Sequence, residues 1–129
     1  MSADPTINLL WGHFYNIVQK TWNFSGRLDR DDDHYSNAAM GLASEAGEAA
    51  DNVKKFLYHS MKGTWAEHRV FYRAKIVLEL GDVLYYMLKL MHVFSISFEE
   101  VIDGNRAKLE SRHPELGKVT ERFGVNAIK

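Results

Sequence analysis

Cysteine is absent from this 129-residue chain. Its absence excludes disulfides, thiolate zinc sites and cysteine nucleophiles, and it fits a reducing compartment. An excess of either charge is also missing, because 16 basic residues stand against 17 acidic ones and the formal net charge is −1. The chain therefore has no general attraction for nucleic acid or anionic lipid, and we expect neither a nucleic acid polymer nor a membrane as its partner.

Targeting and membrane signals are missing as well. The segment Met1–Pro5 lacks the basic and apolar regions of a signal peptide. A long apolar run at residues 76–94 approaches the length of a membrane span, but Glu79, Asp82 and Lys89 inside it would be costly in lipid. We therefore expect a cytoplasmic protein. The chain also has no glycine loop for nucleotide phosphates and no His-Glu-x-x-His motif, which argues against P-loop and zinc-protease chemistry.

Helical periodicity runs through most of the chain, because apolar residues recur at spacings of three and four. An all-α fold is therefore predicted. Thr64-Trp-Ala-Glu67 and Ser97-Phe-Glu-Glu100 have the form of capping boxes, in which a hydroxyl and a glutamate satisfy free backbone donors at a helix start. The first two predicted helices cover residues 7 to about 22 and about 36 to 58. The third opens with the box at Thr64 and runs to about 93, and the fourth opens with the box at Ser97 and ends near 112. A charged loop is predicted at 25–34, and a tail at 115–129 is loose or packs on a second subunit.

Two predicted helices carry packing signals. The first has four apolar residues on one side, namely Leu10, Phe14, Ile17 and Val18. The second is rich in small residues and includes Gly41 and Gly47. Glycine inside a helix costs about 1 kcal/mol relative to alanine, so these two positions predict the close approach of another backbone or of a ligand.

Four carboxylates stand out by their spacing. Glu45 and Glu48 are three residues apart, as are Glu79 and Asp82. On a helix this spacing leaves two side chains about 60° apart and one turn above the other, so each pair can close on one cation. Oxygen ligands of this kind suit a hard divalent ion, and we predict a Mg²⁺ site at these four residues, with Mn²⁺ as a substitute.

The surroundings of the acids support this prediction. Most residues at 76–94 are apolar, and Leu42 and Val53 share a stripe with Glu45. A carboxylate in apolar surroundings is protonated, ion-paired or metal-bound. The alternative is that the acids face solvent or pair with nearby lysines, which are Lys54, Lys55, Lys75 and Lys89.

The combined pattern resembles the MazG-like all-α nucleoside triphosphate pyrophosphohydrolases, whose signature is Glu-x-x-Glu on one helix and Glu-x-x-Asp on the next. The four acids match it residue by residue, and the likeness covers about 35–114 of a single domain at 1–129. One departure is Ser44, where many members have a further glutamate. The resemblance implies a four-helix bundle that assembles as a homodimer or homotetramer.

The resemblance also implies an activity, the Mg²⁺-dependent hydrolysis of a nucleoside triphosphate to the monophosphate and pyrophosphate in nucleotide-pool house-cleaning. Glu45, Glu48, Glu79 and Asp82 would be its catalytic and metal-holding residues. Metal is required because a triphosphate carries about four negative charges and an acidic pocket alone would repel it. Two alternatives remain open, a phosphoribosyl-ATP pyrophosphohydrolase on the same scaffold and a non-catalytic helical module for dimerisation or regulation.

Substrate contacts are expected on several helices. Asn105, Lys108 and Arg112 share a polar face that could receive phosphate or sugar oxygens, and Lys54 is a weaker candidate of the same kind.

Aromatic candidates concern the base, since stacking on a nucleobase contributes roughly 1–3 kcal/mol. Tyr86, one turn after Asp82, looks like a substrate contact of the dCTP-hydrolysing branch of the family. His13 and Trp22 resemble that branch by their spacing on the first helix.

Overall fold

The computed structural model describes residues 5–23, 31–59 and 62–115. Four helices make up this part of the chain, α1 (Pro5–Asn23), α2 (Asp31–Tyr58), α3 (Trp65–Val93) and α4 (Phe98–Arg112). The described residues contain no strand, so the all-α prediction is confirmed. Within the described ranges, no helix combines the length and apolar character that crossing a membrane requires.

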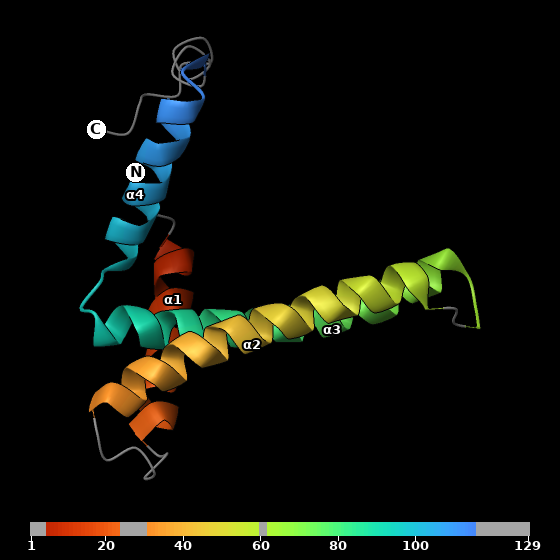
Figure 1. Ribbon diagram of the computed structural model, residues 1–129, viewed down its shortest axis with the longest axis horizontal. Coiled ribbons are helices and arrows are strands. Elements are labelled where there is room, and N and C mark those ends of the chain that lie inside the picture. Colours follow the sequence, from red (N-terminus) through yellow and green to blue (C-terminus); the bar gives the residue numbers. More distant parts are fainter. Residues whose placement is uncertain (1–4, 24–30, 60–61, 116–129) are drawn as a thin grey trace.

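The two longest helices, α2 and α3, form an extended antiparallel pair (Figure 1). Helix α1 crosses this pair near the carboxyl end of α3, and α4 leaves the same end and points away from the pair. The rings of Trp11 and Phe98, 4.3 Å apart at their centroids, link α1 to the start of α4. No residue of α4 is buried. Beyond the crossing with α1, the hairpin extends past the other helices of the described part of the chain.

Both predicted capping boxes are confirmed. Thr64 caps α3, where the Glu67 N–H donates to Thr64 Oγ1 at 3.3 Å and the Thr64 N–H donates to Glu67 Oε2 at 2.6 Å. Ser97 caps α4 in the same way with Glu100. These reciprocal bonds satisfy backbone donors that a helix start otherwise leaves free.

The start of α2 differs from the prediction. The helix begins at Asp31 rather than near Ser36, so the last part of the predicted charged loop is helical. Acidic residues are common in the first turn of a helix, because negative charge there is favoured by the helix dipole, so a sequence rich in aspartate is compatible with this earlier start. The rest of that predicted loop, at 24–30, and the tail at 116–129 lie outside the described residues.

The core lies where α1 crosses α3. Val18 and Leu88 are each 2% exposed, and Met91 packs with them. Five partly buried residues surround this centre, namely Trp11, Phe14, Tyr15, Tyr85 and Met87. The predicted apolar side of the first helix is therefore half right.

Leu10 and Ile17 are the exceptions on that side, at 67% and 49% exposed. The contact with α3 runs instead along Trp11, Phe14 and Val18, which recur at spacings of three and four on one stripe.

Gly41 allows close contact between α2 and α3. A Cβ atom at this position would lie 2.7 Å from Cγ of Tyr86 and closer still to two other ring atoms. The predicted close approach is thus made by an aromatic ring of α3, and not by a backbone. Gly47 has no atom within 4 Å of the corresponding position, so the close approach expected there is not found in one chain.

The two glycines give a matched pair of substitutions. Gly41→Ala is expected to lower the free energy of unfolding by about 1–3 kcal/mol, because the Tyr86 ring must leave its place. Gly47→Ala, with open space around it, should raise stability by up to about 1 kcal/mol through helix propensity. Urea denaturation of both variants tests this, and equal effects of the two substitutions would contradict the packing described for Tyr86.

Candidate functional site

Three of the four predicted acids meet between α2 and α3. Glu45 and Glu48 lie on α2 and Glu79 lies on α3, and one carboxylate oxygen from each falls within 4.8 Å of the others. The antiparallel packing of the two helices brings the i, i+3 pair of α2 opposite Glu79 of α3. We refer to Glu45, Glu48 and Glu79 as the acidic cluster.

Asp82 stands beside the acidic cluster. It is not one of the three residues whose oxygens converge, but its charge acts on Glu45. Glu45 and Glu79 are half-buried, whereas Glu48 and Asp82 are exposed. Nearby Leu78 is 69% exposed and Leu80 is 54% exposed.

The apolar enclosure expected around the acids is therefore absent in a single chain. The enclosure is absent because the hairpin is only two helices wide, so apolar side chains on its sides remain exposed to solvent.

Repulsion between these carboxylates acts on the pKa of Glu45. Burial raises the pKa of Glu45 above its ordinary value of 4.5, and the negative charges of Glu48, Asp82 and Glu79 raise the pKa further. Each of these effects disfavours the ionised form. A positive charge placed among the carboxylates would oppose all of them.

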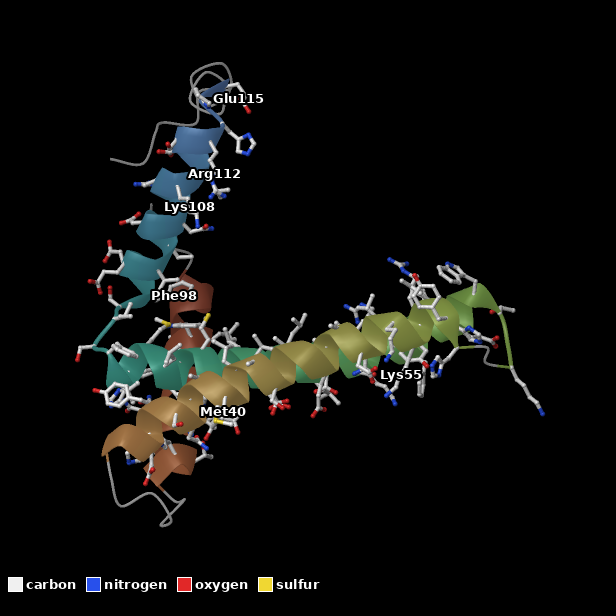
Figure 2. The ribbon with its side chains drawn as sticks, viewed as in Figure 1. Met40, Lys55, Phe98, Lys108, Arg112 and Glu115 are labelled. Carbon is white, nitrogen blue, oxygen red and sulfur yellow. The ribbon has the colours of Figure 1, made fainter. Side chains whose placement is uncertain are left out.

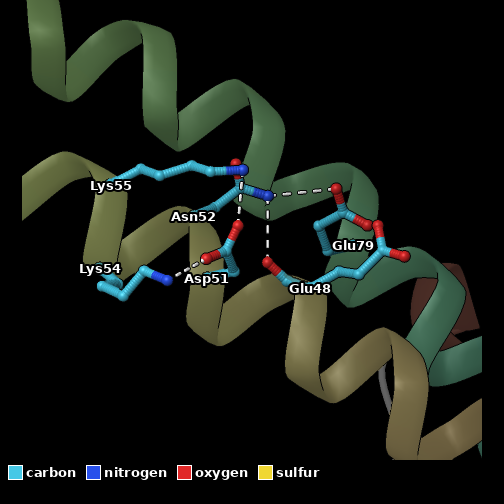
Figure 3. Close-up of polar contacts among 6 residues, drawn as sticks. All are labelled: Glu48, Asp51, Asn52, Lys54, Lys55 and Glu79. Atoms are coloured by element: carbon cyan, nitrogen blue, oxygen red, sulfur yellow. Dashed lines mark hydrogen bonds and ion pairs between the residues drawn. The ribbon is translucent and has the colours of Figure 1, made fainter. Parts of the chain in front are cut away.

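The nearby lysines do not supply that charge. Lys54 and Lys55 both pair with Asp51 on their own helix, at 2.7 Å and 2.5 Å (Figure 3), and hydrogen bonds from these two lysines lower the pKa of Asp51 to about 2. Lys75 Nζ lies 4.8 Å from the centroid of the Phe71 ring. Within the described ranges, none of the four predicted acids has an ion pair.

Lys89, the fourth lysine, is enclosed by aromatic rings. It is 4% exposed, and its Nζ lies 5.2, 5.4 and 5.2 Å from the ring centroids of Trp22, Tyr85 and Tyr86. The ammonium donates to Asn37 Oδ1 at 2.7 Å, and burial lowers the pKa of Lys89. Its charge is thus stabilised by ring faces and an amide. These lysines therefore do not neutralise the acids. The other part of that alternative, exposure to solvent, holds for Glu48 and Asp82.

Tyr86 connects this aromatic group to the acids. Its ring lies against Gly41 of α2 and beneath the Lys89 ammonium. Burial raises the pKa of the Tyr86 phenol, and the charge of Glu45 raises it further. Tyr86 is thus the predicted base contact that the structure brings beside the predicted acids.

The remaining predicted substrate residues lie elsewhere. Asn105, Lys108 and Arg112 are exposed on α4, and Figure 2 shows Lys108 and Arg112 on the part of α4 that points away from the hairpin. Within one chain, α4 does not bring these groups to the acidic cluster.

Two predicted base contacts on α1 differ in exposure. His13 is exposed. Trp22 is buried, its indole N–H donates to His34 Nδ1 at 3.0 Å, and its ring meets His92 edge-on at 5.1 Å. In this conformation the indole packs as part of the protein interior.

One polar residue beside the acids was not predicted from the sequence. Asn52, on α2, is only 7% exposed, and its side-chain amide donates to Glu79 Oε1 at 3.2 Å. Its position one turn after Glu48 was the available signal, because residues four apart on a helix share a face.

The donor set fits a hard divalent cation. Carboxylate oxygens converge from two helices without a cationic side chain among them, and Mg²⁺ and Mn²⁺ prefer oxygen ligands. Glu45, Glu48 and Glu79 could hold such an ion directly, with Asp82 adding negative charge beside them. An ion there would offset the repulsion that raises the pKa of Glu45 and could receive phosphate oxygens.

Comparison with known proteins identifies the family of this chain. The Gene 37 protein of Mycobacterium phage L5 is 38% identical over 77 residues, which are 60% of this chain and 64% of that protein. The chain thus spans less than two thirds of that relative's length. No solved structure gives a significant match. The family model of the MazG nucleotide pyrophosphohydrolase domain matches residues 34–117, well over half of the chain and the whole of α2 and α3 apart from the first residues of α2. The chain therefore belongs to the MazG nucleotide pyrophosphohydrolase family.

Proposed function

We propose that this chain hydrolyses nucleoside triphosphates, including deoxynucleotides, to the monophosphate and pyrophosphate with Mg²⁺ bound at the acidic cluster. The observation that carries this proposal is the convergence of Glu45, Glu48 and Glu79 within 4.8 Å while the four lysines of α2 and α3 have other partners. Unneutralised carboxylates suit a triphosphate only when a cation lies between the two.

In this proposal each group of residues has a separate role. The acidic cluster and Asp82 hold the cation, which when bound polarises phosphoryl oxygens and lowers the pKa of a water. One of the glutamates accepts the proton of the attacking water. Tyr86, beside Glu45, receives the base or sugar.

Phosphate contacts from Asn105, Lys108 and Arg112 require a second copy of the chain, because α4 points away from its own acids. We propose a homodimer, or a homotetramer built from it, held partly by α3. Val70, Val77 and Leu88 lie on one stripe of that helix by their spacing. Helix α1 covers Leu88, whereas Val70 and Val77 are 70% and 53% exposed. The stripe is therefore covered at Leu88 and bare at Val70 and Val77, and a second copy of the chain would cover the bare part.

A nucleotide panel in the presence of Mg²⁺, with pyrophosphate and orthophosphate detected separately, tests the activity. We expect pyrophosphate and a monophosphate as products. Release of orthophosphate, or no turnover of any ribo- or deoxyribonucleotide or of phosphoribosyl-ATP, would contradict the proposal.

Removal of one negative charge from the cluster should abolish most of this activity. Glu48→Gln and Glu79→Gln are each expected to lower kcat roughly 10²- to 10³-fold at saturating Mg²⁺, the range for losing one preorganised charge-stabilising group. Glu99→Gln, at an exposed residue of α4, is the control and should retain activity. Wild-type turnover in either cluster variant would remove that residue from the proposed site.

Removing a charge from the acidic cluster is expected to raise stability even though it lowers activity. Because the folded-state pKa of Glu45 is raised, this residue favours folding below its ordinary pKa and loses that contribution as pH rises through the folded-state value. In metal-free buffer, Glu45→Gln should therefore become more stable relative to the unchanged chain as pH rises from 4 to 7. Added Mg²⁺ should cancel this difference. Thermal denaturation with and without a chelator measures it, and a pH-independent difference would contradict the repulsion described here.

The assembly prediction is also specific. Val77→Glu is expected to give a monomer by light scattering at micromolar concentration, because it places a charge on the bare stripe of α3. Arg73→Glu, at an exposed polar position of the same helix, should leave the oligomer intact. A monomeric unchanged chain would rule out the proposed dimer.

A further inference from the structure

Asn52 is a buried amide that spans the two helices of the site. Its Nδ2 donates to the backbone carbonyl of Glu48 at 3.2 Å and to Oε1 of Glu79 at 3.2 Å (Figure 3). An amide nitrogen carries two hydrogens, so both of its donors are used. The opposite orientation would place an oxygen against two acceptors, and the hydrogen-bond network therefore fixes which end faces Glu79.

The bond constrains the Glu79 carboxylate. One oxygen accepts from Asn52, and the other remains for a further partner. The backbone bond to Glu48 anchors the amide on α2, the helix that carries the other two carboxylates. The position of Glu79 relative to Glu45 and Glu48 is thus set by Asn52, a residue that is only 7% exposed.

Asn52 is uncharged, and this matters for cation binding as much as its contact with Glu79 does. A lysine at this position would cancel the charge that a cation needs, whereas an amide orients the carboxylate and leaves its charge intact. The neighbouring residue, Asp51, also keeps positive charge away from the acids, because it holds Lys54 and Lys55 in ion pairs on α2 (Figure 3).

We infer that Asn52 is a positioning residue that presents Glu79 to the divalent cation and thereby sets the affinity of the site. This inference rests on the proposed function, since it assigns a role toward the cation proposed there. Asn52 acts through Glu79 and makes no contact with the cation itself. Loss of an oriented partner of a metal ligand weakens metal binding about 10- to 100-fold.

The test is a calorimetric titration of the metal-free chain with Mn²⁺ alone. Asn52→Leu removes both donors at similar volume and should weaken Mn²⁺ binding about 10- to 100-fold. Asn52→Ser is the second variant, because its hydroxyl can still bond the Glu48 carbonyl four residues earlier but is too short to reach Glu79. It should fold and show the same weakening. Asn16→Leu makes the same chemical change at an exposed residue of α1 and should bind Mn²⁺ as the unchanged chain does.

The outcomes separate the two proposals. If the unchanged chain takes up no Mn²⁺, the proposed function fails and this inference fails with it. If it binds Mn²⁺ and both Asn52 variants bind equally well, the inference is wrong while the proposed function stands. A purely structural role would lower the melting temperature without changing the affinity of the folded protein. The Mg²⁺ concentration for half-maximal turnover should rise in the Asn52 variants while KM for the nucleotide, at saturating Mg²⁺, stays unchanged.

Discussion

Mutual repulsion among unneutralised carboxylates is the constraint that explains this site. Glu45, Glu48 and Glu79 approach within 4.8 Å across the pair of helices, and like charges this close disfavour one another unless a positive charge intervenes. The chain contains lysines that could intervene, but Asp51 holds two of them and aromatic rings hold the others. The arrangement keeps negative charge available, as the proposed binding of a cation and then of a polyphosphate requires.

The helical hairpin brings the carboxylates together because each helix backbone fixes where its acidic side chains begin. The backbone of α2 carries two acids and Asn52 on one side, and the backbone of α3 carries Glu79 opposite them. The Tyr86 ring fills the space left by Gly41 of α2 and lies beneath the Lys89 ammonium, which also lies over the Trp22 ring of α1. Lys89 therefore connects the aromatic ring beside the acids to helix α1. The open flanks and the isolated α4 leave room for the second copy that we propose.

Much of this fold follows from local signals in the sequence. The capping boxes at Thr64 and Ser97 predict the starts of α3 and α4 because each box is complete within four residues. The pairing of the four acids also follows from the sequence, since their spacing alone places each pair on one helix face.

Local signals could not predict which part of the protein each helix face packs against. The exposure of Leu10 and Ile17, the enclosure of Lys89 and the bond from Asn52 to Glu79 depend on where α1 and α3 lie, which only tertiary packing decides. The early start of α2 at Asp31 was missed because a run of aspartates is typical both of loops and of first helical turns.

The most direct measurement is a crystal structure of the chain grown with Mn²⁺, with the ion located by its anomalous scattering. The carboxylate arrangement predicts a peak between α2 and α3 that is coordinated by oxygens of Glu45, Glu48 and Glu79, with Asn52 still bonded to the remaining oxygen of Glu79. A structure with no peak there, or with a lysine turned into the acidic cluster in place of the ion, would contradict the claim that these acids are kept free for a cation.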